Sequence, residues 1–168
     1  MHTVRLATVL DVTRIAEIHI ASWRKAYAGI VPQDFLDAMD VEERKARWTR
    51  SFLRTTCTLI VAEVDNNVVG FCDSGKNRDA DLPETTAELY TIYLDPEVWG
   101  QGLGAELWKA ASQMLTDQGF TSASVWVIAD NARAIRFYEQ MSFVFDGTSK
   151  VITLAGADLQ EVRMICIL

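Results

Sequence analysis

A glycine-rich turn at residues 100–104 carries the clearest chemical signal in the chain, because it reads Gly-Gln-Gly-Leu-Gly and leads directly into a helical pattern. Glycines at alternating positions allow a backbone to approach a ligand closely. A helix also begins with N–H groups that lack helical partners and with the positive end of its dipole. The turn therefore predicts a binding site for an anion such as a pyrophosphate, formed by backbone groups without any lysine.

Two other kinds of phosphate-binding turn fit this segment less well. A Walker A loop requires Lys followed by Ser or Thr directly after its last glycine, whereas Gly104 is followed by Ala and Glu. A dinucleotide-binding fingerprint can be aligned to Gly100, Gly102 and Ala105. It then requires an acidic residue at the end of the next strand, and Asp130 lies too far along the chain. A dinucleotide-binding oxidoreductase is therefore the less favoured interpretation.

A second motif lies at residues 131–143, where the sequence reads NARAIRFYEQMSF. It resembles the signature N-x-x-A-x-x-F-Y-E-x-x-G-F of the GCN5-related N-acetyltransferase (GNAT) superfamily. Residues 96–108, PEVWGQGLGAELW, resemble motif A of the same superfamily, R/Q-x-x-G-x-G/A. Trp99 stands where motif A has Arg or Gln, and Ser142 replaces the signature glycine. Because two separate motifs occur in the expected order, the chain is identified as similar to this superfamily, and it resembles uncharacterised bacterial members.

This resemblance implies both a fold and a cofactor. The fold would be α/β in an α+β layered form, with a central, mixed but mostly antiparallel twisted sheet of about seven strands. Helices would flank the sheet, which would be splayed between its fourth and fifth strands. The pantetheine arm of acetyl-CoA would insert there like a missing strand. The positions that the resemblance assigns to the cofactor are Ile92, Leu94, Gln101, Gly102, Leu103, Gly104, Ala105, Asn131 and Tyr138.

The implied activity is transfer of the acetyl group to a primary amine by direct attack in a ternary complex. Coenzyme A would leave as a thiolate, and Tyr138 is the candidate acid that protonates it; the alternative is a core aromatic residue in an amphipathic helix. The amine must lose a proton, and Glu88 is the first candidate base. Its parity in the strand predicts a face shared with Tyr90, Ile92 and Leu94, whereas the alternative is an exposed carboxylate at the start of the strand.

The acceptor side in this superfamily is formed by the first helix and the loop after it, here residues 18–36. Trp23 and Tyr27 stand one helical turn apart in this segment, so they either wall an acceptor pocket or belong to the core. Tyr90 is a second candidate for ordering water or substrate. Asn131 begins its helix, where it would act as an N-cap, bind the pantetheine arm, or do both.

The sequence does not choose among acceptor amines, which include a polyamine, an aminoglycoside, an amino acid and a protein or peptide amine. The formal net charge of −7 slightly favours a small cationic amine. It argues against nucleic acid as a partner, because phosphate backbones are bound by clustered positive charge. A non-catalytic acyl-CoA-binding sensor or interaction module is the alternative from another class, since Trp99 and Ser142 depart from the motifs.

The composition fits a single domain, residues 1–168, because 49% of the residues are hydrophobic and can form one core. No stretch approaches the roughly 18 apolar residues needed to span a bilayer, so we expect a cytoplasmic protein without membrane contact. The three cysteines lie far apart, and the chain has only two histidines. These residues match no metal-ligand spacing, so we expect neither a disulfide nor a metal site.

Hydrophobic periodicity and turn residues predict the element order β-α-α-β-β-β-α-β-α-β-β. Asp11 and Asp40 are the predicted N-caps of the first two helices, and Asp65-Asn66-Asn67 is the predicted turn of a hairpin. The last two strands would form an antiparallel hairpin that, by analogy, builds a homodimer. The predicted strands are 4–9, 58–64, 68–73, 86–94, 122–128, 143–154 and 159–168, and the later helices are 41–54, 103–118 and 131–141.

Overall fold

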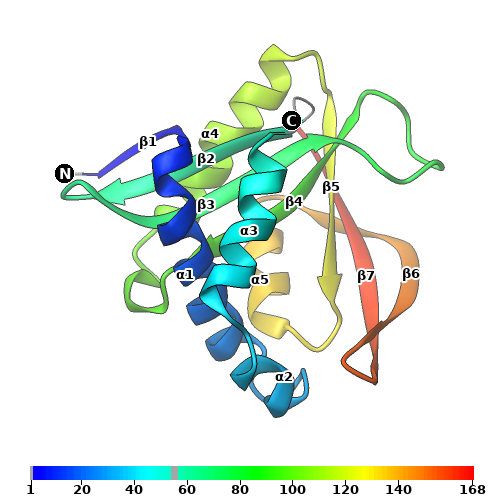
Figure 1. Ribbon diagram of the computed structural model, residues 1–168. Coiled ribbons are helices and arrows are strands. Elements are labelled where there is room, and N and C mark those ends of the chain that lie inside the picture. Colours follow the sequence, from blue (N-terminus) through cyan, green and yellow to red (C-terminus); the bar gives the residue numbers. More distant parts are fainter. Residues whose placement is uncertain (1, 54–56) are drawn as a thin grey trace.

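A seven-stranded mixed sheet runs through the molecule in the order β1-β2-β3-β4-β5-β7-β6 (Figure 1). The computed structural model describes residues 2–53 and 57–168. Neighbouring strands are antiparallel except β4 and β5, which are parallel and are connected through a helix. The strands are β1 (His2–Leu6), β2 (Cys57–Val64), β3 (Asn67–Lys76), β4 (Thr86–Leu94), β5 (Ser122–Ile128), β6 (Val144–Leu154) and β7 (Ala157–Ile167).

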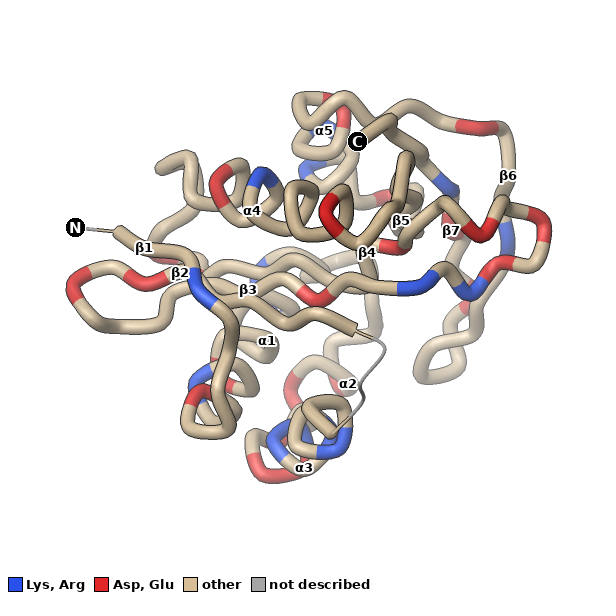
Figure 2. Tube along the Cα trace, turned by 90° about the horizontal axis from the view of Figure 1, so that it is seen from above, with Lys and Arg blue, Asp and Glu red and all other residues tan. Residues whose placement is uncertain are grey.

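Helices cover both faces of this sheet (Figure 2). α1 and α3 lie on one face with the short α2 beside them, and α4 and α5 lie on the other. No helix within the described ranges is long and apolar enough to cross a membrane. The helices are α1 (Val12–Ala26), α2 (Gln33–Asp37), α3 (Val41–Phe52), α4 (Leu103–Asp117) and α5 (Ala132–Gln140), with short 3-10 turns at Val9–Asp11 and Pro96–Val98.

Each face of the sheet has its own hydrophobic core. Leu107 and Phe143 are buried on the α4 and α5 side, and Ile15 and Phe71 are buried on the α1 and α3 side. Burying each of these side chains contributes roughly 1.5–3 kcal/mol relative to leaving it in water. The two cores therefore hold the helices firmly on opposite sides of β4.

The sheet opens between β4 and β5. The two strands pair at only three positions near their starts, from Thr86 with Ser122 to Glu88 with Ser124. β4 nevertheless continues to Leu94 and β5 to Ile128, and the strands diverge along this length (Figure 1). The predicted layered fold, with a sheet splayed between its fourth and fifth strands, is confirmed.

Several local predictions are also confirmed. The observed bounds of β4 and β5 coincide with the predicted strands. The hairpin turn has left-handed backbone at Asp65 (φ 49°) and Asn66 (φ 65°), as its residue types indicated. The Asp40 side chain caps α3 by accepting a hydrogen bond from the Glu43 N–H at 2.9 Å.

The start of the chain differs from its prediction. β1 ends at Leu6, and a 3-10 turn occupies Val9–Asp11. Asp11 makes no side-chain cap on α1; its carboxylate instead accepts the Thr8 N–H at 2.7 Å and pairs with Arg5 at 2.8 Å. The alternation of apolar residues did not reveal this turn, because three residues of a 3-10 helix leave no periodic pattern.

Two further differences concern the helices. The short helix α2 was not predicted, because the Gly29 and Pro32 positions indicated only an interruption of the pattern. The predicted end of α3, residue 54, lies outside the described residues. The observed helix reaches Phe52.

Candidate active site

The alternation of side chains between the two faces of the sheet shifts by one residue at Tyr90 in strand β4. β3 pairs with β4 on both sides of this residue but skips it, which is a β-bulge. As a result, Leu89 before the bulge and Ile92 and Leu94 after it all pack towards the α4 side of the sheet. Side chains of a regular strand alternate, so Glu88 faces the opposite side. The prediction that Glu88 shares a face with Ile92 and Leu94 is therefore wrong.

A cleft occupies the opening between β4 and β5. It has a volume of about 150 Å³ and is reached by side chains from both faces of the sheet. The predicted site residues that line it are Tyr27, Tyr90, Ile92, Leu94, Gly104, Asn131 and Tyr138. The cleft is also lined by Phe137, the phenylalanine of the second motif, and by Tyr93 and Trp126, which no motif marked. The other predicted site residues lie outside this lining: Glu88, Trp23, Gln101, Gly102, Leu103 and Ala105.

The glycine-rich turn lies at the mouth of the cleft. Gly100 (φ 78°) and Gly102 (φ 86°) have left-handed backbone, and Gly102 is the N-cap position of α4. Gly104 is needed for another reason: a Cβ there would lie 3.0 Å from the Phe137 ring and 3.3 Å from Leu94. The absence of side chains keeps the start of α4 close to the cleft, so its N–H groups can face an anionic ligand.

The backbone N–H groups predicted to bind the anion differ in whether they already donate a hydrogen bond. The Ala105 N–H already donates to the Gly102 carbonyl at 3.0 Å. Leu103 and Gly104 form the first turn of α4, where N–H groups have no helical acceptor. The anion-binding capacity therefore resides chiefly in the positions before Ala105.

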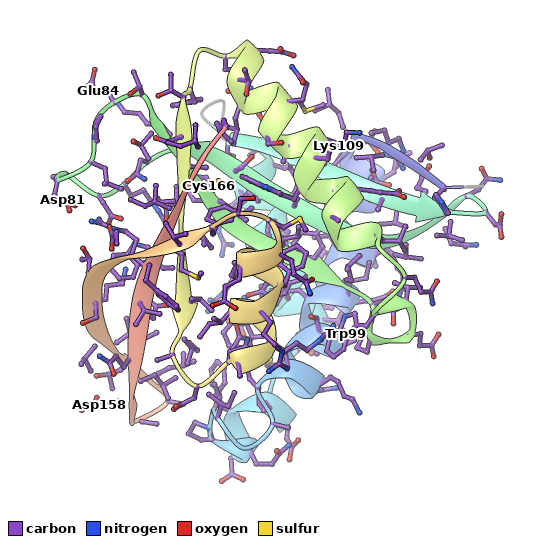
Figure 3. The ribbon with its side chains drawn as sticks, turned by 180° about the vertical axis from the view of Figure 1, so that it is seen from behind. Asp81, Glu84, Trp99, Lys109, Asp158 and Cys166 are labelled. Carbon is purple, nitrogen blue, oxygen red and sulfur yellow. The ribbon has the colours of Figure 1, made fainter. Side chains whose placement is uncertain are left out.

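Trp99 and Arg133 form one edge of the cleft. The Trp99 Nε1 donates to the Leu94 carbonyl at 2.9 Å, and the Arg133 guanidinium carbon lies 3.3 Å from the centre of the Trp99 ring. Trp99 is labelled in Figure 3, beside α5. Helical spacing gave no signal for this contact of Arg133, because Trp99 lies in a distant loop.

Tyr138 is buried on α5 and lines the cleft. Its ring packs against Phe137 and Phe143, with ring centres 5.4 and 5.6 Å away. Burial raises the pKa of Tyr138 well above its ordinary value. The phenol therefore stays protonated at neutral pH, which is the state that an acid requires.

Glu88 is buried and is held by Arg78. Its side chain is 2% exposed, so it is not the exposed carboxylate that the sequence left as an alternative. Arg78 donates to Glu88 Oε2 through Nε at 2.9 Å and through its backbone N–H at 3.1 Å. The same guanidinium lies 4.7 Å from the centre of the Tyr90 ring. Arg78 therefore contacts both Glu88 and Tyr90.

Tyr27, which follows α1, lines the cleft. Burial raises the pKa of Tyr27, and hydrogen bonds to the side chains of Tyr93 and Asn131 partly offset this effect. Asn131 also caps α5, because its Oδ1 accepts the Ala134 N–H at 3.1 Å. Trp23 lies behind Tyr27, with ring centres 4.6 Å apart. Both residues pack against the core, and of the two only Tyr27 lines the cleft.

The arrangement defines a class of enzyme. The sheet opens between β4 and β5, the N-terminus of α4 lies at the mouth of the resulting cleft, and a protonated phenol lies inside it. This arrangement is suited to an acyltransferase that binds its donor along β4. Within the described residues, no group of three or more His, Cys, Asp or Glu side chains is placed to hold a metal ion.

Comparison with known proteins agrees with this class. A model of the Acetyltransferase (GNAT) family matches residues 14–143. Uncharacterized N-acetyltransferase YuaI from Bacillus subtilis is 34% identical over 164 residues, which cover 98% of this chain and 92% of the relative. Mycothiol acetyltransferase from Brachybacterium faecium is 30% identical over 136 residues, which cover 80% of this chain and 39% of that relative.

A solved structure has the same fold. The structure of yncA from Salmonella typhimurium with its cofactor acetyl-CoA has a TM-score of 0.74 at 23% identity, covering 99% of this chain and 93% of that one. The chain belongs to the Acetyltransferase (GNAT) family and is an acetyl-CoA-dependent acyltransferase. Ser142 adopts φ 67°, the left-handed conformation favoured by the signature glycine that it replaces.

Proposed function

We propose that this protein transfers the acetyl group of acetyl-CoA to a primary amine, which attacks directly while both substrates are bound. The observation that supports this most strongly is the cleft between β4 and β5, with the glycine-rich turn at its mouth and buried Tyr138 inside it. The cofactor supplies an activated acetyl thioester.

The chain's own groups can hold this cofactor at two places. The N–H groups from Gln101 to Gly104 bind the pyrophosphate, with Ala105 contributing only if its bond to Gly102 bifurcates. The main chain of Ile92 and Leu94 runs where β4 has lost its pairing with β5, so its edge is available to the pantetheine arm. The Leu94 carbonyl already accepts a hydrogen bond from the Trp99 Nε1.

Proton transfer is assigned to two groups. Tyr138 gives its proton to the departing thiolate, since it is protonated and lies in the cleft. Glu88 does not line the cleft, so it would take the proton from the amine through a water that Tyr90 positions. Tyr27 and Tyr90 would position the acceptor, and Trp23 would fix Tyr27.

Ligand-dependent thermal stability tests the cofactor assignment. We expect acetyl-CoA and coenzyme A, each at about 100 times its dissociation constant, to stabilise the fold by about 2.7 kcal/mol. NAD at the same concentration should leave the melting temperature unchanged. Stabilisation by NAD alone would instead support the dinucleotide-binding interpretation.

A matched pair of variants links this binding to the glycine-rich turn. Gly102 (φ 86°) and Gly147 (φ 89°) both have left-handed backbone and open space around the missing Cβ. Replacing either by Ala costs roughly 1 kcal/mol of backbone strain. Only Gly102→Ala should also weaken binding of coenzyme A, and equal stabilisation of both variants by the cofactor would contradict the proposed pyrophosphate site.

Turnover distinguishes an enzyme from a non-catalytic sensor. The release of free thiol from acetyl-CoA is measured with a panel of polyamines, aminoglycosides, amino acids and peptides. Stabilisation by acetyl-CoA without thiol release for any amine would indicate the sensor and overturn the proposed activity.

A further inference from the structure

A second groove lies between α1 and α3, on the face of the sheet opposite α4. It has a volume of about 290 Å³, and three arginines of α3, Arg44, Arg47 and Arg50, line it together with His19 and Ser51. The α3 arginines are among the blue segments of that helix in Figure 2. Such a concentration of positive charge is notable in a chain of net charge −7.

Arg44 has no partner of its own in this groove. Arg47 pairs with Glu43 at 2.9 Å on the exposed side of α3. Among the described residues, the Arg44 side chain makes no hydrogen bond or ion pair, although it is half-buried and its desolvation lowers its pKa. A partly buried guanidinium without a carboxylate is costly unless a ligand supplies the negative charge.

His19 adds a second unpartnered donor. Its Nδ1 accepts a hydrogen bond from the Trp48 Nε1 at 3.3 Å. Burial, with Arg44 and Arg47 nearby, lowers the pKa of His19 to about 3, so the ring is neutral and its proton lies on Nε2. This nitrogen is buried and has no hydrogen-bond partner among the described residues, while the side chain, 6% exposed, lines the groove.

The groove and the cleft border a common neighbouring cavity. The groove shares Trp48 and Ser51 with this cavity, and the cavity shares Tyr90 and Thr91 with the cleft. The His19 ring also lies 5.0 Å from the ring of Tyr93, which lines the cleft. Because this cavity separates the two sites, an acceptor that occupies both must place its anionic group several bonds away from its amine.

We propose that Arg44 and His19 bind an oxyanion carried by the acceptor, so that the preferred substrates are zwitterionic amines, such as short peptides, whose anionic group lies several bonds from the amine. This inference rests on the acetyl transfer proposed above and adds the substrate class. It replaces the expectation of a cationic amine, because the local charge of the groove acts on the substrate more strongly than the net charge of the chain.

Matched pairs of acceptors test the assignment. Thiol release from acetyl-CoA is measured with amino acids and short peptides and with their carboxamides, and with phosphoethanolamine against ethanolamine. We expect the wild-type protein to have a lower KM for the anionic member of a pair. The pair that shows the largest difference identifies the oxyanion as a carboxylate or a phosphate.

Variants of α3 then identify the residue responsible. Arg44→Gln should raise KM for the anionic acceptor about 10- to 100-fold, the value of a lost hydrogen bond to a charged group, and leave the neutral amide unaffected. Arg44→Lys should recover part of this loss. The matched control is Lys45→Gln, which removes a neighbouring positive charge that pairs with Glu42 and does not line the groove.

The possible failures are distinguishable. Stabilisation by acetyl-CoA verifies that each variant is folded. If amides and polyamines are acetylated as efficiently as the anionic amines, or if Arg44→Gln affects both members of a pair equally, this inference is wrong and the acetyl transfer stands. If no amine of any class is acetylated, the proposed function fails and the inference fails with it.

Discussion

The role of a single residue is decided by its surroundings, as Tyr138 illustrates. A phenol ordinarily titrates near 10 and a thiol near 8.5, so a tyrosine in water gives up a proton to a thiolate only with difficulty. Burial raises the pKa of Tyr138 further. In the proposed mechanism, the hydroxyl would therefore give up its proton only as negative charge develops on the leaving sulfur.

Tyr138→Phe should lower kcat about 100-fold and leave the affinity for acetyl-CoA unchanged. The substitution removes the hydroxyl and keeps the ring that packs against Phe137 and Phe143. Steady-state thiol release gives kcat, and thermal stabilisation by coenzyme A gives the binding. An unchanged kcat with every amine would show that Tyr138 serves only the core.

At the scale of elements, the loop between β3 and β4 is tied to β7, which lies on the far side of β5. Arg163 on β7 is 3% exposed and pairs with Asp79 at 3.2 Å, Asp81 at 2.6 Å and Asp146 at 2.6 Å. Asp81 is labelled on this loop in Figure 3. Since the loop also carries Arg78, the pairing fixes the residue that holds Glu88.

Arg163→Met should destabilise the fold by about 3–5 kcal/mol, because it leaves neighbouring carboxylates without their shared cation. Urea unfolding measures the change. Lys150→Met is the matched control on β6: it breaks a more exposed pair with Glu161 at 3.5 Å, which is worth less than about 1 kcal/mol. Equal losses in the two variants would refute a special role for Arg163.

At the scale of the whole molecule, two buried groups couple folding to pH. In the unfolded chain His19 binds a proton as the pH falls through its ordinary pKa of 6.5, whereas in the folded protein it stays neutral until about pH 3. Arg5 lowers the pKa of Asp11 from 3.8 to about 2, so the unfolded chain also protonates this carboxylate first. In both ranges the unfolded state binds more protons, so acid lowers stability.

The free energy of unfolding should therefore fall steadily from pH 7 to pH 2, through His19 between pH 6.5 and about 3 and through Asp11 between pH 3.8 and about 2. Urea unfolding at a series of pH values gives the slope. His19→Gln should reduce the dependence of the unfolding free energy on pH in the upper pH range. Asp11→Asn should reduce it in the lower range. A slope that neither variant changes would assign the acid sensitivity to other groups.

The sequence by itself determined the strands β4 and β5, the hairpin turn at Asp65 and Asn66, and the glycine-rich start of α4. These features are local: they depend on side-chain alternation, on left-handed backbone and on unpaired N–H groups within a few residues. The two motifs also determined the family, because each lies within one short segment of chain.

Only the tertiary structure decided which side chains meet. The bulge at Tyr90 turned Glu88 away from Ile92, and no feature of the strand's composition marked the extra residue. The contacts of Arg78 with Glu88, Arg133 with Trp99, and His19 with Trp48 join residues from different elements. Their pairing depends on strand register and helix packing, which arise from the whole core and not from any local pattern.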